Sequence, residues 1–327
     1  MNWKKTAAIV IPTIIAIGLI VFMFFRIPFD DLQEALSAMN LLWLPLAVAI
    51  CVCAWFLRGF RYKYILHRLE SEVSVLLATA CIYVSQTANI IVPARLGDFV
   101  RMFILKHEKG TAYTPGFTSL IAERVYDILV IAFLGLCTIP FIITMIPAEY
   151  HWFIWLMAGV LAAGAIGIIF FIAVRRLQSE DKVLKKILEI IAQFRTVSST
   201  WKAFFGLTGI SVIIWLADVS ICYLVAVMFG CYINPFLVLL AIVIGNLVKA
   251  VPITPGGIGT YEVALMVVFE FGGVPAAVAT LIAVIDHLIK NGVTLIGGII
   301  SLYGFGNWAA DLLKRLFKEG KEAADEE

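Results

Sequence analysis

Ionisable residues lie inside apolar segments of this sequence, and their types suit the binding of a phosphate. Each costs roughly 2.5–3.5 kcal/mol on membrane-insertion scales, so each is by default a hypothesis for a functional site. Arginine forks match phosphate oxygens, and carboxylates pair with such cations or carry protons. These residues are Arg58, Arg61, Arg95, Asp98, Arg101, Glu123, Arg124, Asp127, Asp218, Lys249, Glu262, Asp286 and Lys290.

The spacing of several charges places them on common helix faces. Glu123 and Asp127 are four positions apart, and Arg124 and Asp127 are three apart. Asp286 and Lys290 are again four apart, a spacing at which side chains on a helix meet. One interpretation is that these pairs neutralise one another and hold a helix bundle together. Their concentration around two interrupted segments instead favours a binding site.

The segment VPITPGGIGTYE, residues 251–262, interrupts an apolar region. Its prolines lack backbone donors, and its glycines allow conformations that a helix interior excludes. We expect a helix to continue through Val263, with free N–H groups of residues 256–259 at its N-terminus, where an anion is favoured. Glu262 would complement the same dipole or take protons, and Lys249 adds a cation.

The elements that must position these residues are hydrophobic enough to cross a membrane. The 327 residues are 62% hydrophobic and 15% charged, with a mean hydropathy of +0.98, which excludes a soluble domain. Nearly charge-free runs of about 20 residues match a bilayer core ~30 Å thick. The first run is too long for a signal peptide and lacks a cleavage site, so we interpret it as an uncleaved anchor. The six predicted spans are 6–25, 41–65, 117–143, 151–174, 203–229 and 274–303.

Two further apolar segments, 73–105 and 234–270, are each interrupted by proline, glycine and charge. Each half is short for a full crossing, and irregular backbone at membrane depth requires surrounding protein or a watery cavity. We therefore predict two re-entrant helical hairpins whose tips meet inside the bilayer. Two short full spans in place of each hairpin are the alternative.

The two hairpins belong to a predicted inverted repeat, in which each unit runs span, broken hairpin, span. The hairpins would enter from opposite sides, an arrangement typical of transporters with a site near the membrane midplane. Residue identity between the units is weak, so chance similarity is the alternative. The matched positions are Trp55, Asn89 and Asp127 in the first unit and Trp215, Asn246 and Asp286 in the second.

The predicted fold class is an all-α polytopic membrane protein with about six transmembrane helices and the two re-entrant hairpins. Lysine and arginine concentrate in alternate connecting segments, so the positive-inside rule places both termini in the cytoplasm of a cell-membrane protein. Segment 178–197 is predicted to be an amphipathic helix at the interface, or else a connector packed on the bundle. The predicted parts are an anchor at 1–30, a first repeat at 41–143, a span with the amphipathic helix at 151–202, a second repeat at 203–303 and a charged tail at 304–327.

No motif indicates a metal, a cofactor or nucleotide hydrolysis. The six cysteines are scattered, with only one C-x-C pair, and the four histidines are equally dispersed. Walker, H-E-x-x-H and G-x-S-x-G motifs are missing. We therefore expect no ATP-driven pumping by this chain alone, no metal site, no cofactor and no nucleic-acid partner.

Four motifs resemble the transmembrane region of the lysylphosphatidylglycerol synthases, also named the flippase-like domain family: WFLRGFRYKYIL (55–66), NIIVPARLGDFVR (89–101), ERVYD (123–127) and VPITPGGIGTYE (251–262). The resemblance implies a polytopic protein that moves lipids or lipid-linked head groups between leaflets. In the bifunctional bacterial members this region flips an aminoacylated phosphatidylglycerol. The resemblance carries functional roles to Arg58, Arg61, Asn89, Pro93, Arg95, Gly97, Asp98, Arg101, Glu123, Arg124, Asp127, Pro255, Gly256, Gly257, Gly259 and Glu262, and the second repeat adds Asn246, Lys249, Asp286 and Lys290.

The predicted function is transport of an anionic lipid or a polyprenyl-phosphate-linked head group. The sequence ends about 20 residues after the last predicted span, so we expect no soluble aminoacyl-transferase domain and no enzyme activity. A scaffold or accessory subunit for a glycosyltransferase or lipid-modifying enzyme is one rival. An intramembrane lipid-phosphate enzyme is another, although no nucleophile–base set is evident.

In the predicted mechanism, cations and backbone amides hold the phosphate, and acids pair with the cations or couple transport to protons. Rocking of the two repeats would expose the site to each side in turn. The phosphate-holding groups are Arg95, Arg101, Arg124 and the 256–259 amides, and the acids are Asp98, Glu123, Asp127 and Glu262.

Overall fold

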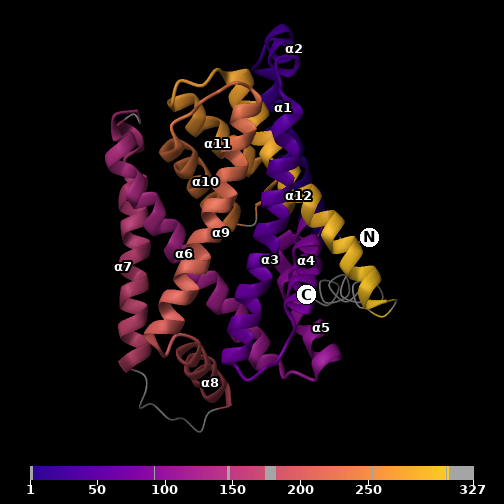
Figure 1. Cartoon of the computed structure of the whole chain (residues 1–327), viewed down its shortest axis with the longest axis vertical. Helices are drawn as coiled ribbons and strands as arrows, with labels where there is room; N and C mark the ends of the chain where they lie inside the picture. The colour runs from indigo at the N-terminus through magenta and orange to yellow at the C-terminus, as the bar shows by residue number, and fades with distance from the viewer. Residues whose placement is uncertain are drawn as a thin grey trace.

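The chain folds as a bundle of helices of very different lengths (Figure 1). The computed structural model describes residues 3–91, 93–145, 148–173, 182–251, 253–306 and 308. Within these residues there are twelve α-helices with short 3-10 helices between them, and no strand. The predicted all-α class is therefore confirmed. The tail predicted at 304–327 lies mostly outside the described residues.

Four helical stretches are long and apolar enough to cross a membrane, judged by length and composition. They confirm the spans predicted at 41–65, 117–143, 203–229 and 274–303. The stretches are η1 with α3 (Leu41–Arg68), α6 with η3 (Tyr113–Met145), α9 (Trp201–Met228) and α12 (Ala276–Phe305).

The other two predicted spans are not confirmed as such. The anchor at 6–25 corresponds to α1 (Trp3–Phe25), which qualifies as a span only together with α2 (Phe29–Ser37), bent from it by 88°. The structure therefore gives four spans, or five if this bent pair counts as one, among the described residues. The span at 151–174 corresponds to α7 (Trp152–Ala173), and its crossing of the membrane stays a prediction.

The first interrupted segment is a helix, a break and a second helix: α4 (Val75–Ile91), η2 (Pro93–Phe99) and α5 (Val100–Lys109). The break folds back on α4 at Gly97. A Cβ atom added there would lie 2.5 Å from the Ser85 carbonyl oxygen and 2.6 Å from the Asn89 backbone nitrogen. Only glycine permits this approach, which keeps the break against the helix that precedes it.

The second interrupted segment has the same order: α10 (Pro235–Ala250), η6 (Pro255–Gly257) and α11 (Thr260–Phe271). Gly256, Gly257 and Gly259 have φ angles of 62°, 77° and 84°. Side chains strongly disfavour this left-handed region, so the three glycines allow the turn between the two arms. The predicted non-helical backbone at these glycines is confirmed.

The two breaks meet near the middle of the bundle. Figure 1 shows α10 and α11 in its upper half and α4 and α5 in its lower half. Between them η6 contacts both α4 and η2, and a Cβ atom on Gly256 would lie 3.4 Å from the Ile90 Cα atom. The prediction that the hairpin tips meet is confirmed as a contact, and their depth in a bilayer stays a prediction.

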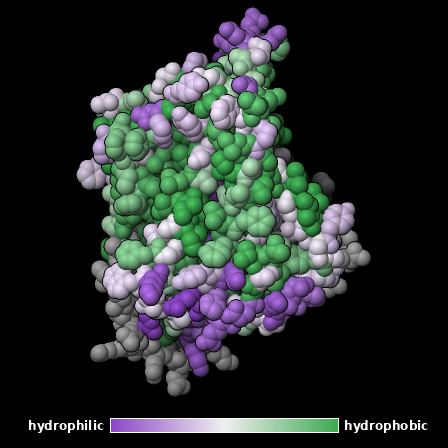
Figure 2. Space-filling view, in the orientation of Figure 1, coloured by the Kyte–Doolittle hydropathy of each residue, from purple (hydrophilic) through white to green (hydrophobic). Residues whose placement is uncertain are grey.

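The surface seen in Figure 2 carries an apolar band with polar side chains above and below it. The apolar side chains at the surface include Ile213, Leu216 and Ile296, each more than two-fifths exposed. A soluble domain rarely leaves so broad an apolar surface uncovered, whereas a lipid-facing bundle does. The band supports the membrane assignment made from composition.

The predicted amphipathic helix is α8 (Lys182–Val197), and residues 178–181 of that prediction lie outside the described part. Phe194 and Val197 are buried in a small apolar cluster with Leu207. The Thr118 hydroxyl on α6 also donates to Gln193 Oε1 at 2.7 Å. These contacts favour the alternative interpretation of this segment, a connector packed on the bundle.

Candidate functional site

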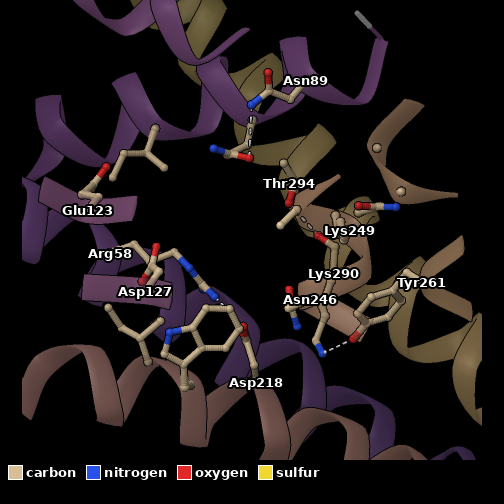
Figure 3. A pocket seen from close by; sticks show the side chains of 18 of the residues that line it. Arg58, Asn89, Glu123, Asp127, Asp218, Asn246, Lys249, Tyr261, Lys290 and Thr294 are labelled. Atoms are coloured by element: carbon tan, nitrogen blue, oxygen red, sulfur yellow. Dashed lines mark hydrogen bonds and ion pairs between the residues drawn. The ribbon is translucent and has the colours of Figure 1, made fainter. Parts of the chain in front are cut away.

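A cavity of about 510 Å³ lies where the two breaks meet, and most of the predicted charges border it. In Figure 3, Glu123 and Asp127 lie across the cavity from Tyr261. Side chains of α3, α4, α5, α6 and α9 form much of the wall, and α10, η6, α11 and α12 complete it. The charged lining residues are Arg58, Arg61, Arg101, Glu123, Arg124, Asp127, Asp218, Lys249 and Lys290.

The spans α3, α6 and α9 are joined at the cavity by two arginines of α3. Arg58 donates to Asp218 at 2.6 Å, and Arg61 donates to the two Asp127 oxygens at 2.6 and 3.1 Å. Arg61 also donates to the Ser211 hydroxyl at 2.9 Å. The WFLRGFR motif thus supplies a bidentate arginine, whose fixed geometry suits a carboxylate.

Arg101, on the second arm of the first hairpin, is almost fully buried and forms an ion pair with Glu123 of α6. Its guanidinium lies 4.5 Å from the centre of the Tyr62 ring. The Nε and Nη2 atoms of Arg101 have no hydrogen-bond partner among the described residues. Buried donors without partners are costly, so this side chain has capacity for an anionic ligand.

Asp98 holds the first break to its surroundings. Arg124 of α6 donates to Asp98 Oδ2 at 2.7 Å. The side-chain amides of Asn89 and Gln86 donate to Asp98 Oδ1 at 2.9 and 3.1 Å, with the Ser85 hydroxyl at 3.4 Å. A single carboxylate therefore connects the break, α4 and α6.

Lys290 and Asp286 form the ion pair on α12 that their spacing predicts. Lys290 Nζ lies 2.8 Å from Asp286 Oδ1 and 2.9 Å from Oδ2. The Tyr261 hydroxyl of α11 donates to Asp286 Oδ2 at 2.8 Å. Asp286 is fully buried behind Lys290, so the ammonium lines the cavity while the carboxylate does not.

A chain of three hydrogen bonds spans the second break. Lys249 Nζ, at the end of α10, lies 3.1 Å from His287 Nε2 of α12, and His287 Nδ1 lies 2.7 Å from Glu262 Oε1. The Gly259 amide donates to Glu262 Oε2 at 2.8 Å. An ammonium only donates and a carboxylate only accepts, so neutral His287 carries its proton on Nδ1.

Three of the four backbone amides at residues 256–259 are not free, contrary to the expectation that these residues offer them to an anion. Gly257 N donates to the Thr254 carbonyl at 3.1 Å, and Ile258 N to the Pro255 carbonyl at 3.1 Å. Glu262 accepts from Gly259 N and so caps α11. These contacts occupy the N–H groups of Gly257, Ile258 and Gly259, so a phosphate at the cavity depends chiefly on the side-chain cations.

The remaining predicted site residues divide into lining and supporting positions. Asn89, Asn246, Gly256 and Gly257 line the cavity. Gly97 and Gly259 serve close packing, the latter against the Ala16 carbonyl oxygen of α1, 2.9 Å from an added Cβ. The side chains of Pro93 and Arg95 lie outside the described residues, so the predicted phosphate contact of Arg95 stays a prediction. Pro255, Asp98, Glu262 and Asp286 lie outside the lining set.

Several lining residues were not among the predicted site residues. Asp218 was noted only as a charge within a span, and His287 had no partner at helical spacing. The uncharged polar and aromatic lining residues could not be recognised from spacing along the sequence, because their partners lie on other helices. The one available sequence signal is that polar residues cluster within apolar spans, which is unusual. The lining set adds Trp55, Gln86, Trp215, Asp218, Thr254, Tyr261, His287, Asn291 and Thr294.

Sequence comparisons relate most of the chain to known membrane proteins. A family model described as lysylphosphatidylglycerol synthase TM region matches residues 9–298. The chain is 31% identical over 298 residues to the glycosyltransferase AglD of Haloferax volcanii, an alignment that covers 78% of this chain and 48% of that protein. The chain therefore spans about half the length of this relative.

Two similar proteins align over nearly their whole length. A UPF0104 membrane protein of Pyrococcus horikoshii is 26% identical, with 88% of this chain and 95% of that protein covered. A UPF0104 membrane protein of Methanothermobacter thermautotrophicus is 21% identical, with 86% and 91% covered.

Proposed function

This chain belongs to the lysylphosphatidylglycerol synthase TM region family of multi-pass membrane proteins, and from that premise we propose that it carries an anionic lipid or a polyprenyl-phosphate-linked head group between leaflets. The cavity between the two breaks would hold the head group, while the acyl or prenyl chains remain in the surrounding lipid. No chemical change to the lipid is part of this proposal.

The distribution of charge at the cavity carries the proposal. Six basic side chains border it against three carboxylates, while Asp98, Glu262 and Asp286 stand behind the lining. The cavity wall therefore carries a net positive charge, although the six basic side chains and all six carboxylates together are neutral. In a low-dielectric bundle such a wall favours an anion strongly, and Arg101 still has unpaired donors.

The two broken hairpins supply a means of movement. We propose that the units 41–143 and 203–303 are inverted repeats, whose rocking exposes the cavity to one leaflet and then the other. Arg58 follows Trp55 by three positions, as Asp218 follows Trp215. These equivalent positions form an ion pair with each other, as expected if a pseudo-twofold axis passes between α3 and α9.

A second candidate is an accessory role beside a glycosyltransferase. The name of the Haloferax volcanii relative supports it, since this chain aligns with about half of a protein called a glycosyltransferase. In that role the cavity would present a lipid carrier to the enzyme, and the purified chain alone would not exchange lipid between leaflets.

A third candidate is an intramembrane enzyme acting on a lipid phosphate. The hydrogen bond from His287 to Glu262 at the cavity supports it, because a carboxylate-oriented histidine is a common general base. Release of free phosphate from lipid by the pure protein would favour this candidate.

Leaflet exchange of fluorescent phosphatidylglycerol in proteoliposomes tests the proposed transport. Wild-type protein should exchange phosphatidylglycerol faster than phosphatidylcholine. Lys249→Gln, at the cavity wall, should slow the exchange at least several-fold, whereas Lys109→Gln, at the exposed end of α5, should not. Equal rates for the two lipids, or for the two variants, would argue against a charge-selective path through this cavity.

A further inference from the structure

Each carboxylate described at the cavity already has a partner within the chain. Two of the pairs, Asp218–Arg58 and Asp127–Arg61, join different spans, and the buried pairs are expensive to break because a lone buried charge remains. An incoming ammonium group would therefore meet no uncommitted acid. The pairs are Asp218–Arg58, Asp127–Arg61, Glu123–Arg101, Asp98–Arg124, Asp286–Lys290 and Glu262–His287.

Several donors at the cavity, by contrast, are uncommitted. Arg101 Nε and Nη2 and the Trp215 indole N–H have no hydrogen-bond partner among the described residues, and all three atoms are buried. Both residues line the cavity. Phosphate oxygens accept several hydrogen bonds at once, so a phosphate is suited to donors that no described side chain satisfies.

Two amides at the cavity add hydrogen-bond acceptors. Asn246 Nδ2 donates to the Ile242 carbonyl at 2.8 Å, which leaves the Oδ1 atom of Asn246 without a hydrogen bond to any described residue. Asn291, one position after Lys290, makes no side-chain hydrogen bond within the described chain and also lines the cavity. A phosphodiester oxygen can accept from an amide NH2 group but has no proton to donate to these carbonyl oxygens, whereas a hydroxyl group can do both.

From these three observations we propose that the cavity selects head groups in which a phosphate is joined to an uncharged, hydroxylated remainder, and that it excludes aminoacylated head groups. The phosphate faces Arg101 and Trp215, and the hydroxyls face Asn246 and Asn291. A cavity of about 510 Å³ lies within the usual range for small-molecule sites, ~300–1,000 Å³, so it admits a glycerol or a hexose beside a phosphate.

This selectivity rests on the proposed function, since it names the class of cargo for the same cavity. It sets this chain apart from the aminoacylated lipid that the family description suggests. A lysyl group would add two ammonium charges to a wall that already has three more cations than carboxylates. Phosphatidylglycerol and a polyprenyl-phosphate hexose share the favoured chemistry, with glycerol or sugar hydroxyls.

The test compares leaflet exchange of four labelled probes in proteoliposomes of wild-type protein: phosphatidylglycerol, phosphatidylmethanol, lysyl-phosphatidylglycerol and a polyprenyl-phosphate hexose. Phosphatidylmethanol has the same charge as phosphatidylglycerol and no hydroxyl. We expect the hydroxylated phosphates to exchange roughly 3- to 10-fold faster than phosphatidylmethanol, the effect of one or two hydrogen bonds. Lysyl-phosphatidylglycerol should exchange at the rate of empty liposomes. Whichever of the two hydroxylated probes is faster identifies the glycerol or the sugar as the source of the hydroxyls.

The variant Asn291→Leu separates recognition from folding. It should lower the ratio of the rates for the hydroxylated probes and for phosphatidylmethanol to about one, whereas a folding defect would slow every probe by the same factor and keep that ratio. Exchange of lysyl-phosphatidylglycerol as fast as that of phosphatidylglycerol would overturn the selectivity and leave the transport proposal standing. Failure of all four probes, with protein that unfolds at the normal temperature, would overturn the transport proposal itself.

Discussion

At the scale of single residues, the main feature of the cavity wall is a set of ion pairs that join different helices. Arg58 reaches from α3 to Asp218 on α9, and Arg101 reaches from the first hairpin to Glu123 on α6. In lipid, where apolar burial does not distinguish a neighbouring helix from an acyl chain, such polar contacts determine which helices associate. The same pairs keep the cavity wall polar, so stability and binding depend on the same side chains.

The Arg58–Asp218 pair allows a direct measurement of this dual role. Arg58→Gln and Asp218→Asn should each lower the unfolding temperature in detergent, because each leaves a part-buried charge without its partner. The double variant should lose less free energy of unfolding than the two single variants lose together, with a coupling free energy of about 0.5–3 kcal/mol. Strictly additive losses would show that the two side chains do not stabilise each other.

The capping of α11 by Glu262 gives a second prediction at this scale. Glu262→Ala removes both acceptor oxygens, so the Gly259 amide and His287 both lose their partner, at a cost of about 1–3 kcal/mol each. We expect faster hydrogen exchange at the Gly259 amide. Glu270→Ala, at the other end of the same helix and partly exposed, is the matched control. Unchanged protection at Gly259 in both variants would contradict the cap.

At the scale of elements, the breaks rather than the spans make the cavity. A continuous helix has its backbone groups paired internally and offers a ligand only side chains on one face. The breaks at η2 and η6 end two helices in the middle of the bundle, and Lys249 of α10 and Arg101 of α5 reach the cavity from those ends. Close backbone packing at glycine keeps each break in place.

Gly97 tests the importance of this packing. Gly97→Ala places a methyl group against backbone atoms of α4 that cannot move independently. We therefore expect the free energy of unfolding to fall by about 1–3 kcal/mol and lipid exchange to slow. Gly206→Ala in α9 is the control, since an added Cβ there meets nothing within 4 Å and alanine favours the helix. Equal unfolding temperatures for the two variants would argue against a fixed first break.

The sequence predicted where the breaks and the charged residues lie better than it predicted which charged side chains pair with each other. Pro, Gly and charge inside apolar segments located both breaks, and local spacing predicted the Asp286–Lys290 pair. Local spacing also suggested Arg124 with Asp127, yet Arg124 pairs with Asp98 from the first hairpin. Partner choice between helices depends on how the bundle packs, which a spacing within one helix cannot show. For the same reason the contacts of His287, which directly follows Asp286, were recognisable only once α10 and α11 were placed beside it.

At the scale of the whole molecule, transport by rocking inverted repeats requires the two hairpins to enter from opposite sides of the membrane. In a protein whose six natural cysteines are replaced, we predict that Tyr232→Cys, 80% exposed before α10, reacts with an impermeant maleimide in intact cells. Lys109→Cys, at the end of α5, should react only after permeabilisation. Reaction of both sites in intact cells would rule out the inverted arrangement and the cytoplasmic placement of the termini proposed with it.

Blocking the cavity and measuring exchange of phosphatidylglycerol tests directly whether the head group passes through it. Asn246→Cys in the same cysteine-free background would be treated in proteoliposomes with a negatively charged methanethiosulfonate, which adds bulk to the cavity wall. If the head group passes through this cavity, exchange should fall to the rate of empty liposomes and recover when the reagent is reduced off. Complete modification with an unchanged rate of exchange would contradict transport through this cavity, because the lipid would then take another path.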